Sequence, residues 1–281
     1  AGLEAARVLG ERGHRVVVLE AADVPGGQVR LAAMAQRRRD LIGIVDWRVS
    51  EAKHSGVEFR YGAYADADTV LAEHPDVVVV ATGGLPNTSF LRRGAELVND
   101  TWDVMSGTVH LQGTVLVYDD NGAEPALDAA ELLATRGATV GFVTPERMLA
   151  PGVGAMNSPA YLRAFDEHDV SVTLGTRLTG VERSAGGRLV ARLRNDYSER
   201  ETERLVDHVV VEHGTLPNDE LYFELVPLSG NGGAVDHQAL LDVRPQPAMD
   251  GEFQLFRIGD AVTSRNIHAA IYDAVRLCLA I

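Results

Sequence analysis

AGLEAARVLGERGHRVVVLE, residues 1–20, is the stretch that decides the fold. Gly2 stands where the third glycine of a G-x-G-x-x-G turn would stand, directly ahead of an amphipathic helical pattern that ends at Gly13. The apolar strand 15–19 follows and closes on Glu20, the position at which an acid accepts hydrogen bonds from a ribose. These residues predict the second half of a dinucleotide-binding βαβ unit, with Gly2 and Glu20 among its binding residues.

The opening stretch contains only part of this motif. The first strand and the first two glycines of a complete βαβ unit would precede Ala1, and the helical pattern 266–281 runs to the last residue. We therefore expect the chain to be a piece of a longer polypeptide.

Composition restricts the class of protein. The 281 residues are 46% hydrophobic and hold no apolar run of membrane-spanning length, which predicts a globular protein. The net charge of −14 argues against nucleic acid or an anionic membrane as a partner. A single cysteine, Cys278, excludes an internal disulfide, a CxxC pair and a cysteine-ligated iron–sulfur cluster within this stretch, and it fits a reducing, cytoplasmic setting.

Short β-branched runs alternate with amphipathic helical segments, which predicts an α/β fold with parallel sheets in three layers. Four consecutive valines, 77–80, predict a strand buried on both faces. Segments 177–181, 188–194 and 203–211 alternate more regularly and predict an antiparallel meander. The other expected strands are 57–61, 114–118, 139–144, 170–174, 206–212 and 254–258, and the expected helices are 2–12, 39–55, 125–136 and 159–168.

An internal repeat predicts two units of the same kind. Residues 125–145 align without gaps on residues 1–21, and Gly137 falls on Gly13. The chain thus holds two Rossmann-like units, and the second is inserted in the first. Two proline-bearing stretches, ATGGLPNTSFL (81–91) and EHGTLPNDELY (212–222), mark the crossings. The predicted domains are 1–107 with 217–281, and 108–216.

Three further motifs identify a family. They are PGGQVRLAA (25–33), PDVVVVATGG (75–84) and FRIGDAVTSRNIHAAI (256–271). Together with VYDDNGAEPALDAAELLATRG (117–137) they resemble the C-terminal half of the iron–sulfur flavoproteins related to old yellow enzyme. That group includes trimethylamine dehydrogenase, histamine dehydrogenase and 2,4-dienoyl-CoA reductase. The resemblance covers essentially the whole chain.

The resemblance implies FAD, or ADP alone, bound by this half, with FMN and a [4Fe–4S] cluster in an upstream β/α barrel that performs the substrate chemistry. It implies no catalytic residue and no metal ligand here. A solvated helix start at Arg37–Arg39 and a plain turn at Gln28 are alternative interpretations. The residues assigned to the cofactor are Gly2, Glu20, Ala21, Gly26, Gly27, Gln28, Arg39, Ala65, Ala81, Thr82, Gly83, Gly259, Asp260 and Ile267.

The second unit departs from a working fingerprint. Asn121, Ala123 and Ala126 occupy its three glycine positions. Ala123 places a Cβ where the backbone must approach a pyrophosphate, and Ala126 is expected to loosen helix–strand packing. Thr144 replaces the ribose acid, and Asp119 with Asp120 would repel an incoming phosphate if both point inward. NAD(P) binding is therefore not expected.

The predicted function is the nucleotide-binding part of a flavin-dependent oxidoreductase of the amine dehydrogenase or demethylase kind. One alternative is an NAD(P)H-dependent flavin or enoyl reductase in which both domains are active. The other is a non-catalytic ADP-binding module whose acidic face docks an electron-transfer protein. The expected partners are an adenine dinucleotide, the upstream barrel and an electron-transfer protein, without nucleic acid or membrane.

Overall fold

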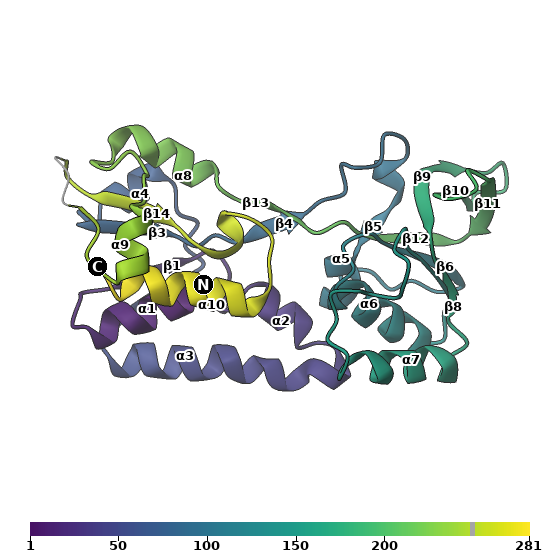
Figure 1. Ribbon diagram of the computed structural model, residues 1–281, viewed down its shortest axis with the longest axis horizontal. Coiled ribbons are helices and arrows are strands. Elements are labelled where there is room, and N and C mark those ends of the chain that lie inside the picture. The colour runs from purple at the N-terminus through teal and green to yellow at the C-terminus, as the bar shows by residue number, and fades with distance from the viewer. Residues whose placement is uncertain (248–250) are drawn as a thin grey trace. The chain divides into compact units, whose positions relative to one another are not determined.

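The computed structural model describes residues 1–247 and 251–281, and the chain forms two compact units (Figure 1). Unit 1 comprises Ala1–Arg30, Asp40–Leu85 and Thr215–Ile281, and unit 2 comprises Leu31–Arg39 and Pro86–Gly214. The α/β class, with parallel sheets and antiparallel strands, is confirmed. The domain boundaries read from the sequence remain a prediction.

Unit 1 contains two parallel strand pairs, β1 with β2 and β3 with β14. Val17 pairs with Glu58 in the first, and Val77 with Gln254 in the second. Its strands are β1 (Val17–Glu20), β2 (Glu58–Tyr61), β3 (Val77–Val80) and β14 (Gln254–Arg257). Its helices are α1 (Gly2–Glu11), α3 (Ile42–His54), α4 (Ala67–Leu71), α8 (Glu220–Leu225), α9 (His237–Asp242) and α10 (Ile267–Cys278), with 3₁₀ turns η3 (Val226–Leu228) and η4 (Gly259–Ala261).

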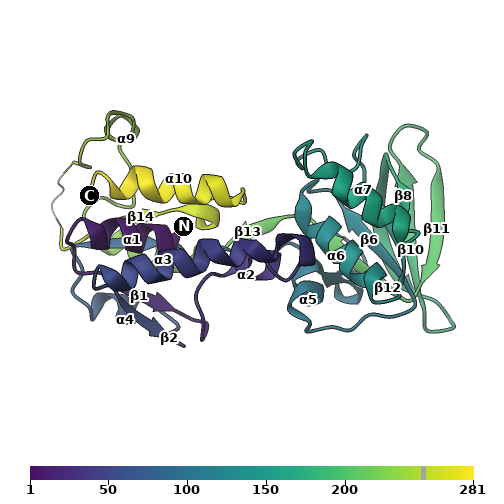
Figure 2. The same ribbon diagram turned by 90° about the horizontal axis from the view of Figure 1, so that it is seen from below.

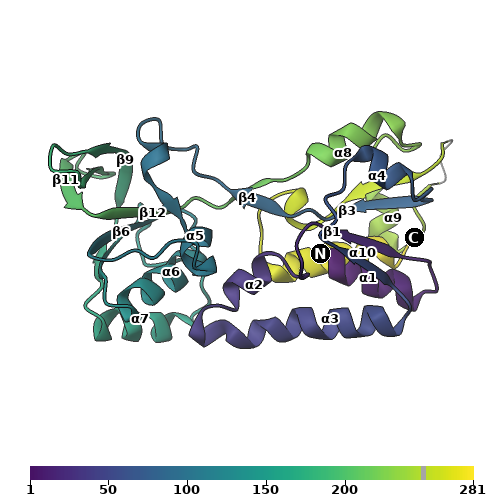
Figure 3. The same ribbon diagram turned by 180° about the vertical axis from the view of Figure 1, so that it is seen from behind.

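Helices cover both faces of the strands of unit 1. Helix α1 packs between α3 and α10, and the three lie side by side in Figure 2. Its buried face, Ala5 and Val8, contacts Phe256 and Ile258 from the end of β14. Helices α4 and α8 cover the opposite face, where Leu225 and Leu255 are fully buried (Figure 3). The sequence pattern of the first βαβ half therefore folds as expected.

The prediction for the four valines is wrong for three of them. Val80 is buried, but Val77, Val78 and Val79 are only partly buried. Within residues 1–247 and 251–281, β3 has a ladder partner on one edge, β14, and β1 has one, β2. With a ladder partner on one edge only among these residues, β3 is an edge strand rather than a central one, and three of its side chains stay partly exposed.

Unit 2 is built on a five-stranded parallel sheet with the order β5-β12-β6-β7-β8. Alternate residues of β6 point to opposite faces: Val115 and Val117 toward the helices, Leu116 and Tyr118 toward the meander. Its elements are η2 (Ala95–Leu97), β5 (Asn99–Asp100), α5 (Thr101–Ser106), β6 (Thr114–Asp119), α6 (Glu124–Thr135), β7 (Thr139–Val143), α7 (Ser158–Glu167), β8 (Ser171–Thr173) and β12 (His208–Glu212).

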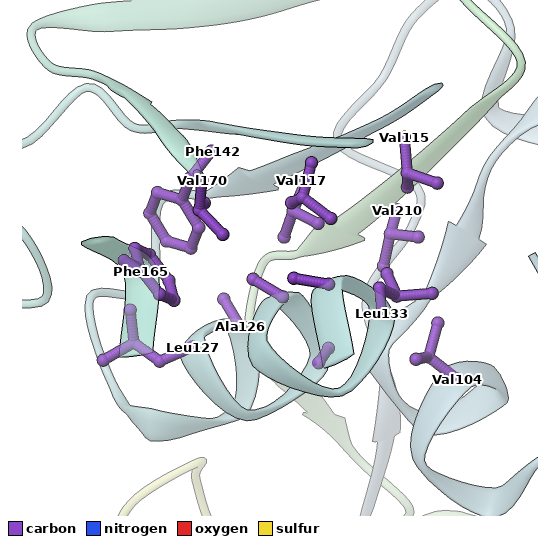
Figure 4. Close-up of a cluster of buried hydrophobic side chains, with 14 of the residues drawn as sticks. Val104, Val115, Val117, Ala126, Leu127, Leu133, Phe142, Phe165, Val170 and Val210 are labelled. Atoms are coloured by element: carbon purple, nitrogen blue, oxygen red, sulfur yellow. The ribbon is translucent and has the colours of Figure 1, made fainter. Parts of the chain in front are cut away.

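The main core of unit 2 lies between this sheet and helices α5, α6 and α7. Figure 4 shows Val115, Val117 and Val210 of the sheet above Ala126 and Leu133 of α6. Ala126 is fully buried there, so the expectation that its Cβ would loosen the packing is wrong. The side chain is small enough for helix and sheet to close around it.

The antiparallel meander covers the other face of the sheet with strands β9 (Thr176–Arg183), β10 (Leu189–Asn195) and β11 (Glu201–Val206). The predicted third strand, 203–211, splits at Asp207, because β12 beyond it joins the parallel sheet. Asp207 forms this corner: its N–H donates to Thr114 O, and its Oδ2 accepts from Thr114 N at 2.8 Å.

Three short elements span the boundaries between units: α2 (Gln28–Ala32), η1 (Gln36–Leu41) and β4 (Gly84–Pro86), which pairs with β13 (Thr215–Pro217). In unit 2, Arg37 and Arg38 of η1 bind α6. Arg37 forms a two-pronged pair with Glu131 and stacks on Tyr161, and Arg38 donates to Asp128 at 2.7 Å. The solvated-helix interpretation is thus wrong for these two arginines.

Candidate nucleotide-binding site

The N-terminal end of α1 meets the ends of β3 and β14. A Cβ built on Gly2 would lie 3.2 Å from the Cβ of Ala81, and one built on Gly259 would lie 2.7 Å from the Cβ of Ala1. The backbones of three segments that are distant in sequence therefore approach each other closely here. The first N–H groups of α1 have no partner within the helix and carry the positive end of its dipole, so this end of α1 suits an anion.

The turn after β14 is held in a defined shape. Gly259 has φ +64°, which favours glycine, and its N–H donates to Asp273 Oδ2 of α10 at 3.2 Å. Arg265 is ion-paired with Asp273, and its backbone N–H donates to Asp260 Oδ1 at 3.3 Å. The carboxylate of Asp260 is thereby fixed beside the start of α1.

The glycine loop 26–27 delivers Gln28 to the same place. Gln28 Nε2 donates to Asp260 Oδ2 at 3.1 Å and lies 3.9 Å from a Cβ built on Gly83. Gly26, at φ +121°, packs so closely that a Cβ would lie 2.8 Å from Val45. Gly27, at φ +49°, has no such neighbour within 4 Å. The structure thus brings Gln28 and Asp260 into contact. A plain turn, the alternative interpretation of Gln28, would not require this contact.

The segment after β3 closes this region on a second side. Thr82 Oγ1 donates to Asn218 O, and Asn218 N donates to Gly83 O at 3.0 Å. The predicted residues Gly2, Ala81, Gly83, Gly259, Asp260 and Gln28 are therefore clustered in unit 1.

The predicted ribose end lies at the end of β1. Glu20 Oε1 accepts from Ala22 N at 3.0 Å, and Glu20 O accepts from Ala63 N at 2.9 Å. Ala21 is exposed, and Ala65 is half-buried just ahead of α4. One carboxylate oxygen of Glu20 is thus engaged with its own loop, and Oε2 accepts no hydrogen bond from residues 1–247 and 251–281.

Two further predicted residues belong to other segments. Arg39 is exposed and belongs to the segment Leu31–Arg39 of unit 2. Ile267 is half-buried and opens α10, whose first turn approaches η4 at Ala270. His268, the next residue, is exposed.

Sequence reasoning missed a charged cluster at the same end of α1. Glu4 is 3% exposed, and its two carboxylate oxygens lie 2.6 Å from Arg7 and from Arg48 respectively. Trp47 lies against both guanidinium groups. The i,i+3 spacing of Glu4 and Arg7 was visible in the sequence, but the partnership with Arg48 of α3 was not.

The two acids at the end of β6 point to different partners, so the condition for the expected repulsion of a phosphate, that both point inward, is not met. Asp119 Oδ1 turns back to accept from the backbone N–H groups of Asn121 and Gly122 at 3.1 and 3.0 Å. Asp120 accepts from the hydroxyl of Tyr118 and is hydrogen-bonded to His213. Burial raises the pKa of Asp119 to about 7, and the nearby Glu212 carboxylate adds to this.

The loop before α6 is covered by the chain itself. Gly152 N donates to Gly122 O at 2.8 Å, and Pro151 lies 3.0 Å from a Cβ built on Gly122. Gly122 takes the left-handed conformation in this loop, with φ +71°. Residues 150–152 therefore lie directly against the loop that precedes α6.

Other kinds of site find no support in the described part of the chain. Among residues 1–247 and 251–281, no three His, Cys, Asp or Glu side chains are arranged to hold a metal ion. No helix described is both long enough and apolar enough to cross a bilayer. Cys278 is buried, and burial raises the pKa of its thiol to about 12, so it is not a reactive thiolate.

Comparison with known proteins gives a consistent result. The sequence model of the family described as pyridine nucleotide-disulphide oxidoreductase matches residues 1–274. A probable N-methylproline demethylase of Rhizobium meliloti is 53% identical over 99% of this chain and 41% of its own length. The N,N-dimethylglycine/sarcosine dehydrogenase of Chromohalobacter salexigens is 43% identical over 99% of this chain and 42% of its own length.

A solved structure extends the comparison to the fold. Histamine dehydrogenase from Rhizobium sp. 4-9 superposes with a TM-score of 0.83 at 23% identity, covering 99% of this chain and 42% of that one. The chain thus spans about two fifths of the length of the curated relatives it matches. The resemblance to amine-oxidising flavoproteins that was read from the motifs is confirmed.

Proposed function

The chain belongs to the pyridine nucleotide-disulphide oxidoreductase family, and from this premise we propose that unit 1 binds FAD within a flavin-dependent oxidoreductase that acts on N-methylated amines. The observation that carries the proposal is the contact between Gln28 and Asp260 beside the N-terminal end of α1. The relatives named as demethylase and dehydrogenase support the substrate class.

The residues present fit the cofactor. The first turn of α1 offers N–H groups to the pyrophosphate, and Glu20 lies at the strand end where a ribose is bound. Gly2, Gly83 and Gly259 let the backbone segments lie close together, since a Cβ at Gly2 or Gly259 would meet a neighbouring segment of the same chain. When bound, the flavin would supply the two-electron chemistry, and the side chains here bind and orient it.

The other residues predicted from the sequence to bind the cofactor are also part of the proposal. We propose that Ala21, Gly26, Gly27, Ala65, Ala81, Thr82 and Ile267 line the nucleotide in unit 1 and that Arg39 completes it from its own segment. ADP alone in the same site is the alternative. Asp260 accepts hydrogen bonds with both oxygens, so it suits hydroxyl groups of the sugar chain better than phosphate.

We propose that unit 2 does not bind NAD(P)H, because residues 150–152 cover its loop and Ala123 stands at the second glycine position. One observation favours the alternative of a working reductase: Asp120 is turned toward Tyr118 and His213, away from the loop. Titration with NADH and NADPH separates the two, since only a reductase bleaches its flavin with either one.

The upstream part of the polypeptide is the proposed site of substrate oxidation. The relatives are more than twice as long as this chain, which leaves room for a β/α barrel carrying FMN and a [4Fe–4S] cluster. Electrons would pass between the barrel and unit 1, and onward to an electron-transfer protein. The single cysteine fits a reducing cytoplasmic setting.

The test is anaerobic titration of the full-length protein with N-methylproline and with dimethylglycine, followed by flavin absorbance. Loss of the oxidised flavin band with an N-methylated amine, but not with proline or glycine, which carry no N-methyl group, supports the proposal. A flavin that stays oxidised with every amine and is bleached by NADPH would assign the reductase function instead.

A further inference from the structure

A buried carboxylate lies where unit 1 is proposed to bind a diphosphate. Glu4 is in the first turn of α1 and is 3% exposed. An acid at this position stabilises the helix through its dipole, but it also repels an anionic ligand at the same end. Its charge therefore has to be neutralised before a diphosphate can bind well.

Two arginines neutralise it from opposite sides. Arg7, one turn along α1, donates to Glu4 Oε1 at 2.6 Å, and Arg48 of α3 approaches Oε2 to 2.6 Å. Arg7 is shared with Glu11, which it reaches at 2.6 Å. Arg48 is 14% exposed and also donates to Ile44 O at 3.0 Å. Among residues 1–247 and 251–281, Arg48 forms an ion pair with Glu4 only.

The two arginines also lower the pKa of the Glu4 carboxyl. Burial alone would raise the pKa of Glu4, but Arg7 and Arg48 outweigh it and the pKa is lowered, so Glu4 stays ionised. Trp47 covers this pair of arginines, with its ring 5.2 Å from Arg7 and 5.3 Å from Arg48.

We propose that Arg48 is a positioning residue for the nucleotide: by neutralising Glu4 it keeps the N-terminal end of α1 receptive to a diphosphate. The inference rests on the proposed function, since it concerns the same site. This role can be distinguished from a direct contact between Arg48 and the nucleotide. If Arg48 acts through Glu4, its loss is harmless once Glu4 is uncharged.

The experiment is a double-mutant cycle in the full-length protein after removal of its bound nucleotide, with ADP as the probe and calorimetry as the readout. The variants are Arg48→Met, Glu4→Gln and the combination of both. Arg60→Met is the matched control. Arg60 forms ion pairs with Glu58 of β2 and with Glu73, which follows α4, and not with a residue of α1. Thermal unfolding without ADP shows that each variant is folded.

We expect R48M to weaken ADP binding by about tenfold, which corresponds to one uncompensated charge near the ligand at a near-surface dielectric. E4Q alone is expected to tighten binding about threefold and to steepen its salt dependence, because Arg48 is then released. The combined variant is expected to bind like the wild type, and R60M to leave the affinity unchanged.

The outcomes separate the two claims. Wild-type protein that binds neither ADP nor FAD contradicts the proposed function. Wild-type binding with an unaffected R48M, or with an R48M defect that E4Q does not rescue, overturns only the role of Arg48. If R48M fails to fold, E4Q decides alone: weaker or unchanged ADP binding in E4Q overturns the inference.

Discussion

Gln28 Nε2 donates a hydrogen bond of 3.1 Å to Asp260 Oδ2, joining two residues that are 232 positions apart in the chain. One belongs to the glycine loop 26–27 and the other to the turn that follows β14. This bond connects two sequence motifs that were identified separately, and it fixes one oxygen of Asp260 while the backbone of Arg265 fixes the other.

Replacing Gln28 by Glu tests the importance of this bond. Gln28→Glu would put two carboxylates about 3 Å apart, so we expect FAD retention to fall and the affinity for ADP to drop at least tenfold. Gln238→Glu is the matched control, because Gln238 donates to Asp242 at 2.9 Å in an exposed part of α9. An equal loss in both variants would contradict the assignment.

Gly259 is expected to tolerate no side chain. Gly259→Ala adds a Cβ 2.7 Å from that of Ala1 at a φ of +64°, so we expect a loss of more than about 2 kcal/mol of unfolding free energy. Gly43→Ala, at an exposed helical position with no neighbour within 4 Å, should instead be neutral or stabilise by about 0.5 kcal/mol. Denaturant unfolding measures both. A Gly259→Ala protein as stable as the wild type would show that the three segments do not meet as described.

Asp119 makes unit 2 sensitive to pH. Burial raises the pKa of this carboxyl to about 7, so the native state favours the protonated form. The corresponding stability is fully present below the unfolded pKa near 4 and is lost as the pH rises through 7. Asp119→Asn stays neutral and keeps an oxygen for the N–H groups of Asn121 and Gly122.

We therefore expect Asp119→Asn to be more stable than the wild type by roughly 4 kcal/mol at pH 8 and nearly equal to it at pH 4. Thermal unfolding between pH 4 and pH 8 measures this difference, with Asp68→Asn on the exposed surface of α4 as the control. A gain that is the same at every pH, or a loss at pH 8, would rule out a raised pKa as the cause.

The segment Leu31–Arg39 is expected to stabilise unit 2 chiefly through Arg38. Its partner Asp128 is 2% exposed and also accepts from the hydroxyl of Tyr161 at 2.6 Å. Arg38→Met leaves a buried carboxylate without its cation, which costs about 3 kcal/mol. Arg37→Met removes a more exposed pair with Glu131 and should cost about 1 kcal/mol or less. Equal effects in denaturant unfolding would contradict this ranking.

Much of the fold follows from local sequence pattern. The helix 2–12 and the strand ending at Glu20 are set by periodicity and by Gly13, and the parallel strands of unit 2 by short β-branched runs. The strand predicted at 203–211 could not be divided correctly, because the corner at Asp207 depends on a hydrogen bond to Thr114, 93 positions away. Local alternation contains no information about such a partner.

The site was predictable only as far as its motifs extend. Glycines and the residues beside them were identifiable because close backbone approach requires them, as at Gly2 and Gly259. Arg48 and Asp273 carry no motif, because the contacts that matter here, with Glu4 and with Gly259 N, are made by tertiary packing. The orientation of Asp120 was likewise set by His213, which the sequence does not place beside it.

The most direct test of the central claim is the identity of the nucleotide that the full-length protein carries. The protein is denatured, and the released nucleotides are identified and quantified by mass spectrometry, with Asp260→Ala as the comparison. We predict one FAD for each chain, lost or strongly reduced in Asp260→Ala while any FMN bound elsewhere stays constant. Release of ADP alone, or FAD that is unaffected by the loss of Asp260, would contradict the claim that unit 1 is a flavin site.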